Sequence, residues 1–329
     1  MSSARATVAP SDAETNPTGT RCTIQDYQKA IWGPRPQDGF AKRPYDTVGL
    51  QFGLTALQGR QILAEQFVDL NEKLGSKDID SQFVSGRIAA DPGSLEIAYR
   101  TAQVSDARQL ANVPIIDLRG HDNVEIHTDY NSYVIRARLD RDNGHHENQV
   151  IFTGAIPLLG DTAFLCATNE AADLPDDACT HSPLLLMDRW LNAIAADASK
   201  DSQAVKVVRN KPTDAVDTCF IGGQAVTDAT VCSTAFPYFG SPRLGAGAPL
   251  AHDVLKCGLK PLDRADYAAS TFSDAQWLRL QAAFPEGVCD WSKPGIGQQV
   301  SVPWMSFAEG PGGKPLAAAP VSVPLGASK

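Results

Sequence analysis

The sequence has no clustered basic stretch and no long apolar run. Its 329 residues include 29 lysines and arginines against 38 aspartates and glutamates, and no run of lysine and arginine exceeds two residues. Nucleic-acid binding needs a clustered basic surface, so this chain of net charge −9 is not expected to bind nucleic acid. Its longest apolar stretches, such as residues 183–187, are far shorter than the roughly 20 residues of a membrane-spanning helix, which excludes a membrane span.

Several motifs that mark catalytic or binding sites are also missing. A serine hydrolase of the α/β type carries its nucleophile in G-x-S-x-G, and no serine of this sequence lies in that pattern. Neither G-x-G-x-x-G nor a Walker loop occurs, so no nucleotide cofactor is expected. The cysteines form no C-x-x-C pair, and a structural zinc site is therefore not expected. Residues 1–16 have no apolar segment, so the chain as written carries no signal peptide.

Cysteine, in contrast, is abundant. The seven cysteines are Cys22, Cys166, Cys179, Cys219, Cys232, Cys257 and Cys289. Two neighbouring pairs, Cys166 with Cys179 and Cys219 with Cys232, have the same separation, and short closed loops of this kind are typical of disulfides. Cys257 and Cys289 would form a third disulfide, which leaves Cys22 alone. The cysteines therefore indicate an oxidising compartment.

Hydrophobic periodicity predicts an α/β fold. Helical spacing of apolar residues predicts helices at residues 56–74, 94–107, 128–141, 183–196 and 273–284. Short apolar runs at 113–120 and 149–154 predict buried parallel strands. The helix at 183–196 begins at Ser182-Pro183, a typical N-terminal signal, and carries Leu185, Leu186, Trp190, Leu191 and Ile194 on its apolar face. Alternating strands and helices are typical of a parallel sheet.

The segment that follows the first strand contains candidate catalytic residues. Functional side chains of α/β sheets lie at the carboxyl ends of strands, and residues 120–127 hold that position. Asp122 could orient a histidine as a catalytic acid, or it could simply cap the next turn. His181, directly before a helix, and His127, close to Asp122, are the candidate bases. His121, Asp122 and His127 also form a possible metal-ligand set, for which an ordinary polar loop is the alternative.

Six segments, taken together, resemble one protein family. They are RCTIQDY (21–27), NVPIID (112–117), RARL (136–139), NQVI (148–151), MDRWL (187–191) and FPEGVCDWS (284–292). The sequence from about residue 22 to residue 307 is similar to a bacterial family of exported α/β-hydrolase-like proteins, distantly similar to tannase and feruloyl-esterase-type enzymes. Its members are about twice as long, with the nucleophile in their N-terminal half, so this chain resembles their C-terminal half.

This resemblance implies an organisation and a function. We expect a disordered leader (1–21), a helical cap-like segment (22–110), an α/β-hydrolase core with the last strands of a parallel sheet (111–199), and a loop-rich, disulfide-bearing extension (200–329). The implied function is hydrolysis of a small-molecule or polymeric ester in an extracellular or periplasmic location. A serine from the missing half would be the nucleophile, His181 or His127 the base, and Asp122 the acid.

Two other functions remain open from the sequence. One is a non-catalytic protein derived from a hydrolase, which binds a partner or ligand or is a truncated product. The other is metal-assisted hydrolysis at His121, Asp122 and His127.

Overall fold

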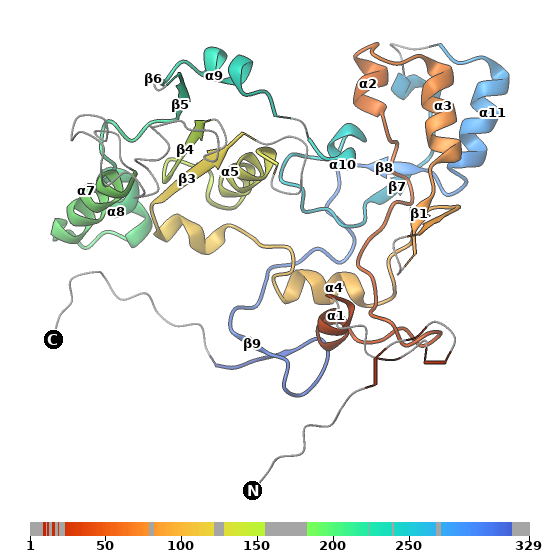
Figure 1. The fold of residues 1–329 in the computed structure, drawn as a ribbon, viewed down its shortest axis with the longest axis horizontal. Coiled ribbons are helices and arrows are strands. Elements are labelled where there is room, and N and C mark those ends of the chain that lie inside the picture. The colour runs from red at the N-terminus through yellow and green to blue at the C-terminus, as the bar shows by residue number, and fades with distance from the viewer. Residues whose placement is uncertain are drawn as a thin grey trace, which may run out of the picture. The chain divides into compact units, whose positions relative to one another are not determined.

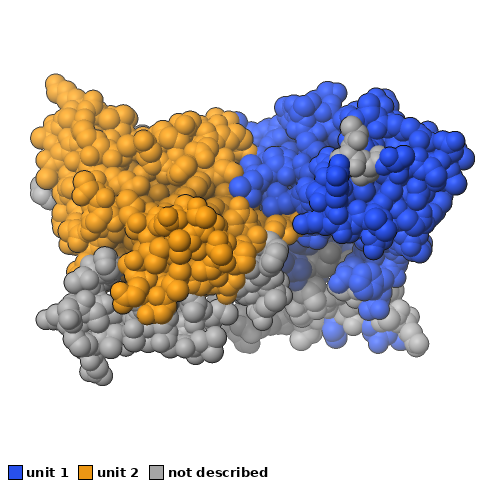
Figure 2. Space-filling model, turned by 90° about the horizontal axis from the view of Figure 1, so that it is seen from above, with its two compact units in different colours: residues 1–105, 242–320 blue, residues 106–241, 321–329 orange. Residues whose placement is uncertain are grey.

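The computed structural model describes residues 9–10, 12, 15–16, 19, 24–78, 82–121, 128–154, 183–222, 224–238, 240–267 and 271–317. The chain divides into two compact units (Figure 2). Unit 1 consists of residues 1–105 and 242–320, and unit 2 consists of residues 106–241 and 321–329. Nothing in this division tests the four segments predicted above, which stay a prediction.

Unit 2 is built on a four-stranded sheet (Figure 1). Its strands are β3 (Ile115–Gly120), β4 (Gln149–Gly154), β5 (Thr218–Ile221) and β6 (Gln224–Val226), in that spatial order. The two predicted strands are confirmed, since β3 and β4 pair in parallel with Ile115 opposite Gln149. β5 is parallel to β4, whereas β6 returns antiparallel to β5. The sheet is therefore mixed, and not parallel throughout as the sequence predicted.

Helices cover both faces of this sheet. On one face, α7 (Pro183–Ala196) and α8 (Gln203–Arg209) bury Trp190 and Val207 against Val150 and Phe220. On the other face lies α5 (Tyr130–Asn143), whose Ser132 hydroxyl accepts a hydrogen bond of 2.9 Å from Nε of Arg119 in β3. The remaining described helices of unit 2 are the short η1 (Arg108–Asn112) and α9 (Ala229–Ala235).

The predicted helix at 183–196 is confirmed as α7, but its apolar face is narrower than predicted. Leu186, Trp190 and Ile194 are buried, whereas Leu185 is 56% exposed. The buried side chains are spaced by four residues, so they form a single row along the helix. Leu185 lies beside that row and points away from the sheet.

Unit 1 contains short helices and three two-stranded sheets among the described residues. The helices are α1 (Ile24–Trp32), α2 (Leu54–Gln58), α3 (Ala64–Lys73), α4 (Ser94–Arg100), α10 (Pro242–Gly245), η4 (Arg264–Tyr267) and α11 (Asp274–Ala283). The strand pairs are β1 (Ser76–Lys77) with β2 (Phe83–Val84), β7 (Gly258–Lys260) with β8 (Val288–Asp290), and β9 (Met305–Ser306) with β10 (Lys314–Pro315). Phe67 of α3 and Leu280 of α11 lie at the centre of its core, fully buried.

The long helix predicted at 56–74 is wrong, because two helices occupy that stretch. α2 ends at Gln58, Gly59 follows, and Arg60 adopts a left-handed conformation with φ of 56°. α3 then begins after Leu63, whose backbone N–H donates to Oε1 of Gln66 at 2.8 Å. Glycine is a poor helix former, and the apolar spacing alone did not reveal this interruption. In the same way, the helix predicted at 94–107 ends early, at Arg100 of α4.

Two of the predicted disulfides are confirmed. Cys219 is bonded to Cys232, which joins β5 to α9 in unit 2. Cys257 is bonded to Cys289, which lies in β8 of unit 1. Cys22, Cys166 and Cys179 lie outside the described residues. Over the described ranges, no helix combines the length and the apolar character that crossing a membrane requires.

Candidate functional site

The three predicted catalytic residues, Asp122, His127 and His181, lie outside the described residues, and their roles stay predictions. Of the alternative metal-ligand set, His121 alone is described. In the part of the chain that the structure describes, no group of three or more His, Cys, Asp or Glu side chains could hold a metal ion.

His121, which is partly buried, forms a dyad with the buried Asp129, a pair that the sequence alone did not predict. The backbone N–H of His121 donates to the carbonyl oxygen of Gly154 at 2.7 Å, so the histidine lies at the carboxyl ends of β3 and β4. Its Nδ1 is 2.6 Å from Oδ2 of Asp129, which precedes α5 and is 2% exposed. A carboxylate beside Nδ1 is the arrangement that orients a histidine ring for proton transfer at its other nitrogen, Nε2. A histidine oriented in this way is suited to act as a general base.

A second histidine–aspartate pair occupies the opposite end of the strands. Nδ1 of His146 lies 2.8 Å from Oδ1 of Asp140, just before β4 begins. Both side chains are nearly half exposed, at 44% and 48%, whereas the His121 side chain is 26% exposed. This pair has the same chemistry without the position at the carboxyl edge, so it serves as a matched control for His121 and Asp129.

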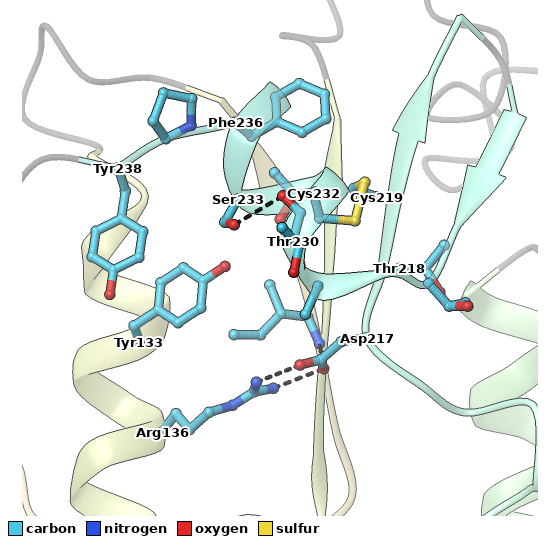
Figure 3. A pocket seen from close by; sticks show the side chains of 15 residues that line it. Tyr133, Arg136, Asp217, Thr218, Cys219, Thr230, Cys232, Ser233, Phe236 and Tyr238 are labelled. Carbon is cyan, nitrogen blue, oxygen red and sulfur yellow. Dashed lines mark hydrogen bonds and ion pairs between the residues drawn. A yellow bond between two sulfur atoms is a disulfide. The ribbon is translucent and has the colours of Figure 1, made fainter.

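A cavity of about 630 Å³ opens in unit 2 between α5, the strands β4 and β5, and α9 (Figure 3). Binding sites for small molecules typically have volumes of this size. Its lining is aromatic and rich in hydroxyl groups, and includes Tyr133, Thr153, Thr218, Thr227, Thr230, Ser233, Phe236 and Tyr238. The cavity therefore suits a ligand with both apolar and hydrogen-bonding groups.

Two stacked tyrosines form one wall of the cavity. The rings of Tyr133, from α5, and Tyr238 are nearly parallel, at 17°, with centroids 4.4 Å apart. Burial raises the pKa of the Tyr133 hydroxyl above its usual value, so this group stays protonated at neutral pH. The wall thus offers aromatic surface together with a neutral hydroxyl.

An ion pair lies next to Tyr133 in the lining, since Arg136 comes from the same helix, α5 (Figure 3). The guanidinium of Arg136 donates to both carboxylate oxygens of Asp217, with 2.8 Å between Nη2 and Oδ1. The same Oδ1 accepts the backbone N–H of Ile151 in β4 at 3.0 Å. Burial alone would raise the pKa of Asp217, but the hydrogen bonds and charge of Arg136 outweigh it and lower that pKa. Arg136 and Asp217 therefore neutralise each other at the cavity.

The ion pair makes a prediction about pH. Because the pKa of Asp217 is lower in the folded state, the ionised carboxylate stabilises unit 2 above the unfolded pKa of about 4, and this contribution disappears as the pH falls through the folded pKa. Asp217 is half exposed, so we expect Asp217→Asn to lower the free energy of unfolding by only about 1 kcal/mol at pH 7. At pH 3 the difference should shrink.

Urea unfolding at the two pH values, followed by hydrogen exchange of the β4 amides, measures this difference. Asp214→Asn is the control, because both side chains of the ion pair between Asp214 and Arg189 are more than half exposed. If Asp217→Asn lowers the free energy of unfolding equally at pH 7 and pH 3, the charge of Asp217 does not contribute to stability.

Phe236 connects the dyad to the cavity. Its side chain lines the cavity, and its ring meets the ring of His121 edge to face, with centroids 5.4 Å apart. Phe236 is therefore the side chain that contacts His121 and also lines the cavity. One sequence signal for the dyad was usable, because Asp129 lies at the start of the helix that follows His121. No local pattern pointed to Phe236 or Tyr238.

A family model described as a tannase-like family of unknown function (DUF6351) matches residues 3–300. No curated protein and no solved structure matches the chain.

Proposed function

Because this chain belongs to a tannase-like family of unknown function, we propose that it takes part in the hydrolysis of carboxylic esters. The observation that carries the proposal is the His121–Asp129 dyad at the carboxyl ends of two parallel strands, beside a cavity of suitable size. Nε2 of His121 would take the proton of the attacking hydroxyl and then return it to the leaving alcohol. Asp129 would hold the ring and stabilise the imidazolium that forms between the two steps.

The nucleophile in this proposal is a serine outside this chain, because the sequence contains no G-x-S-x-G. The acyl or aryl group of the ester would occupy the cavity against Tyr133, whose ring and protonated hydroxyl suit an aromatic acid. Asp122, His127 and His181 stay alternative bearers of the acid and base roles. The disulfides fit a protein of an extracellular or periplasmic location, which we also propose.

Labelling by a fluorophosphonate tests the proposal, since this probe reacts with a serine that a base has activated. The protein is purified from its own cells without denaturation, so that any polypeptide bearing the nucleophile copurifies, and the labelled residue is mapped by mass spectrometry. We expect label on a serine outside this chain. The label should be lost in His121→Asn and retained in the control His146→Asn.

Any other result of the labelling would show which part of the proposal is wrong. Label that survives His121→Asn but is lost in His127→Asn or His181→Asn would move the base to that histidine. A labelled serine within this chain would overturn the external nucleophile. No label and no hydrolysis of p-nitrophenyl esters would favour a non-catalytic protein, and hydrolysis that a chelator abolishes would favour the metal-assisted alternative at His121, Asp122 and His127.

A further inference from the structure

Helix α9 buries little of its own surface. Six of its seven residues are exposed, and the half-buried one is Cys232. Its side-chain hydrogen bonds are local: Oδ1 of Asp228 accepts the N–H groups of Thr230 and Val231 at 2.8 and 3.0 Å, and the Ser233 hydroxyl donates to the carbonyl oxygen of Thr230. A helix this short is marginal by itself in water. Its position must therefore depend on other attachments.

The strongest of these attachments is the disulfide between Cys232 and Cys219. Cys219 is 1% exposed and lies in β5, opposite Thr153 of the buried strand β4. Cys232 lies in the middle of α9 (Figure 3). The bond thus joins an exposed helix to the rigid centre of the sheet.

The segment that this bond holds, residues 227–238, provides more than half of the residues that line the cavity. We call it the α9 segment. Near its end, the ring of Phe236 meets the ring of His121, and the ring of Tyr238 stacks on Tyr133. The position of the α9 segment therefore determines both the cavity wall and the surroundings of the dyad.

We propose that the Cys219–Cys232 disulfide is a redox-sensitive tether, whose reduction releases the α9 segment from the cavity and from His121 while the sheet stays folded. A thiolate of a dithiol reductant attacks Sγ of Cys232, the more exposed of the two cysteines, and the S–S bond breaks. Cys219 leaves as a thiolate and takes up a proton. The second thiol of the reductant then displaces Cys232 as a thiol, so two electrons and two protons pass to the protein and the reductant becomes a disulfide.

Hydrogen exchange measured by mass spectrometry tests the tether on the full chain. Cys219→Ser/Cys232→Ser is compared with the oxidised wild type, and Cys257→Ser/Cys289→Ser, which removes the disulfide of unit 1, is the matched control. The disulfide links residues that are 13 positions apart. Without this link, we expect hydrogen exchange of the α9 amides to become about 100-fold faster. The β4 amides should keep their protection, and the control variant should leave α9 unchanged.

A second readout follows His121 directly. Modification of His121 by diethylpyrocarbonate should become faster when dithiothreitol reduces the wild type, because Phe236 no longer covers its ring. His146 provides an internal reference whose rate should not change. Reoxidation should restore the original rate of His121.

Two results would overturn the tether. If α9 stays protected without the disulfide, other contacts hold it. If β4 loses protection together with α9, the disulfide stabilises the whole sheet and does not control one segment. Neither readout uses an ester substrate, so the outcome is independent of the proposed ester hydrolysis.

Discussion

Replacing Asp129 with asparagine is expected to lower ester hydrolysis roughly 10⁴-fold while unit 2 stays folded. Oδ2 of Asp129 lies 2.6 Å from Nδ1 of His121 and has no room to move far, since the side chain is almost fully buried. An asparagine amide can donate to Nδ1, which would place the ring proton on Nε2 and remove the lone pair that accepts the serine proton. It would also remove the charge that stabilises the imidazolium.

The measurement is the rate of p-nitrophenyl ester hydrolysis by the complex that contains the nucleophile. Asp140→Asn, which alters the exposed pair with His146, is the control and should hydrolyse at the wild-type rate. Hydrogen exchange of β4 shows whether the Asp129 variant keeps its fold. A folded Asp129→Asn that hydrolyses esters at the wild-type rate would mean that another residue, such as Asp122, orients the base.

Two strands of the sheet, β3 and β4, were predictable because each contains a short run of apolar residues. All six residues of β4 are buried, and its centre is the apolar run 150–152; β3 has Ile115, Ile116 and Leu118, although its residues are only partly buried. β5 and β6 were not predicted because they have four and three residues and lie among cysteines and glycines. Strands this short carry no detectable alternation; β5 pairs with β4, and β6 pairs with β5. The mixed character of the sheet therefore comes from a local antiparallel pairing of β5 with β6, which the apolar pattern did not reveal.

Apolar spacing can conflict with local backbone conformation, as the first predicted helix shows. Apolar spacing over residues 56–74 fits one long helix, yet Gly59 and the left-handed Arg60 divide it. The interruption improves the packing of the core, because it lets Leu57 of α2 and Phe67 of α3 both pack in one cluster with Leu280. The apolar spacing included the buried Leu57 and Phe67 but also the exposed Leu63 and Leu70, and it did not reveal the bend.

The sequence directed attention to the region of the His121–Asp129 dyad, but it did not identify the pair. The rule that functional residues follow strands pointed to the segment after β3, where His121 lies, and the roles predicted for Asp122 and His127 in that segment stay predictions. Choosing among the nearby carboxylates needs the shape of the turn, and Asp129 reaches His121 from eight positions away. Phe236 and Tyr238 come from more than a hundred residues further along the chain, and no local pattern links them to α5.

The largest effect on stability is expected at Trp190. Its side chain is 0% exposed between α7 and the sheet, and its Nε1–H donates to the carbonyl oxygen of Val207 at 2.8 Å. Trp190→Ala would remove this packing, leave a cavity, and leave the Val207 carbonyl without its donor. We expect the free energy of unfolding of unit 2 to fall by about 3–5 kcal/mol, measured by urea unfolding with hydrogen exchange of β4 as the local probe.

Leu185→Ala is the matched control on the same helix, because Leu185 is 56% exposed and should change stability by less than about 0.5 kcal/mol. Trp190→Phe separates the two contributions, since phenylalanine keeps an aromatic ring against Val150 and Phe220 but cannot donate to Val207. The free energy of unfolding of Trp190→Phe should lie between those of the wild type and Trp190→Ala. Equal effects of Trp190→Ala and Leu185→Ala would contradict the packing of α7 on the sheet, and with it the sheet that supports His121.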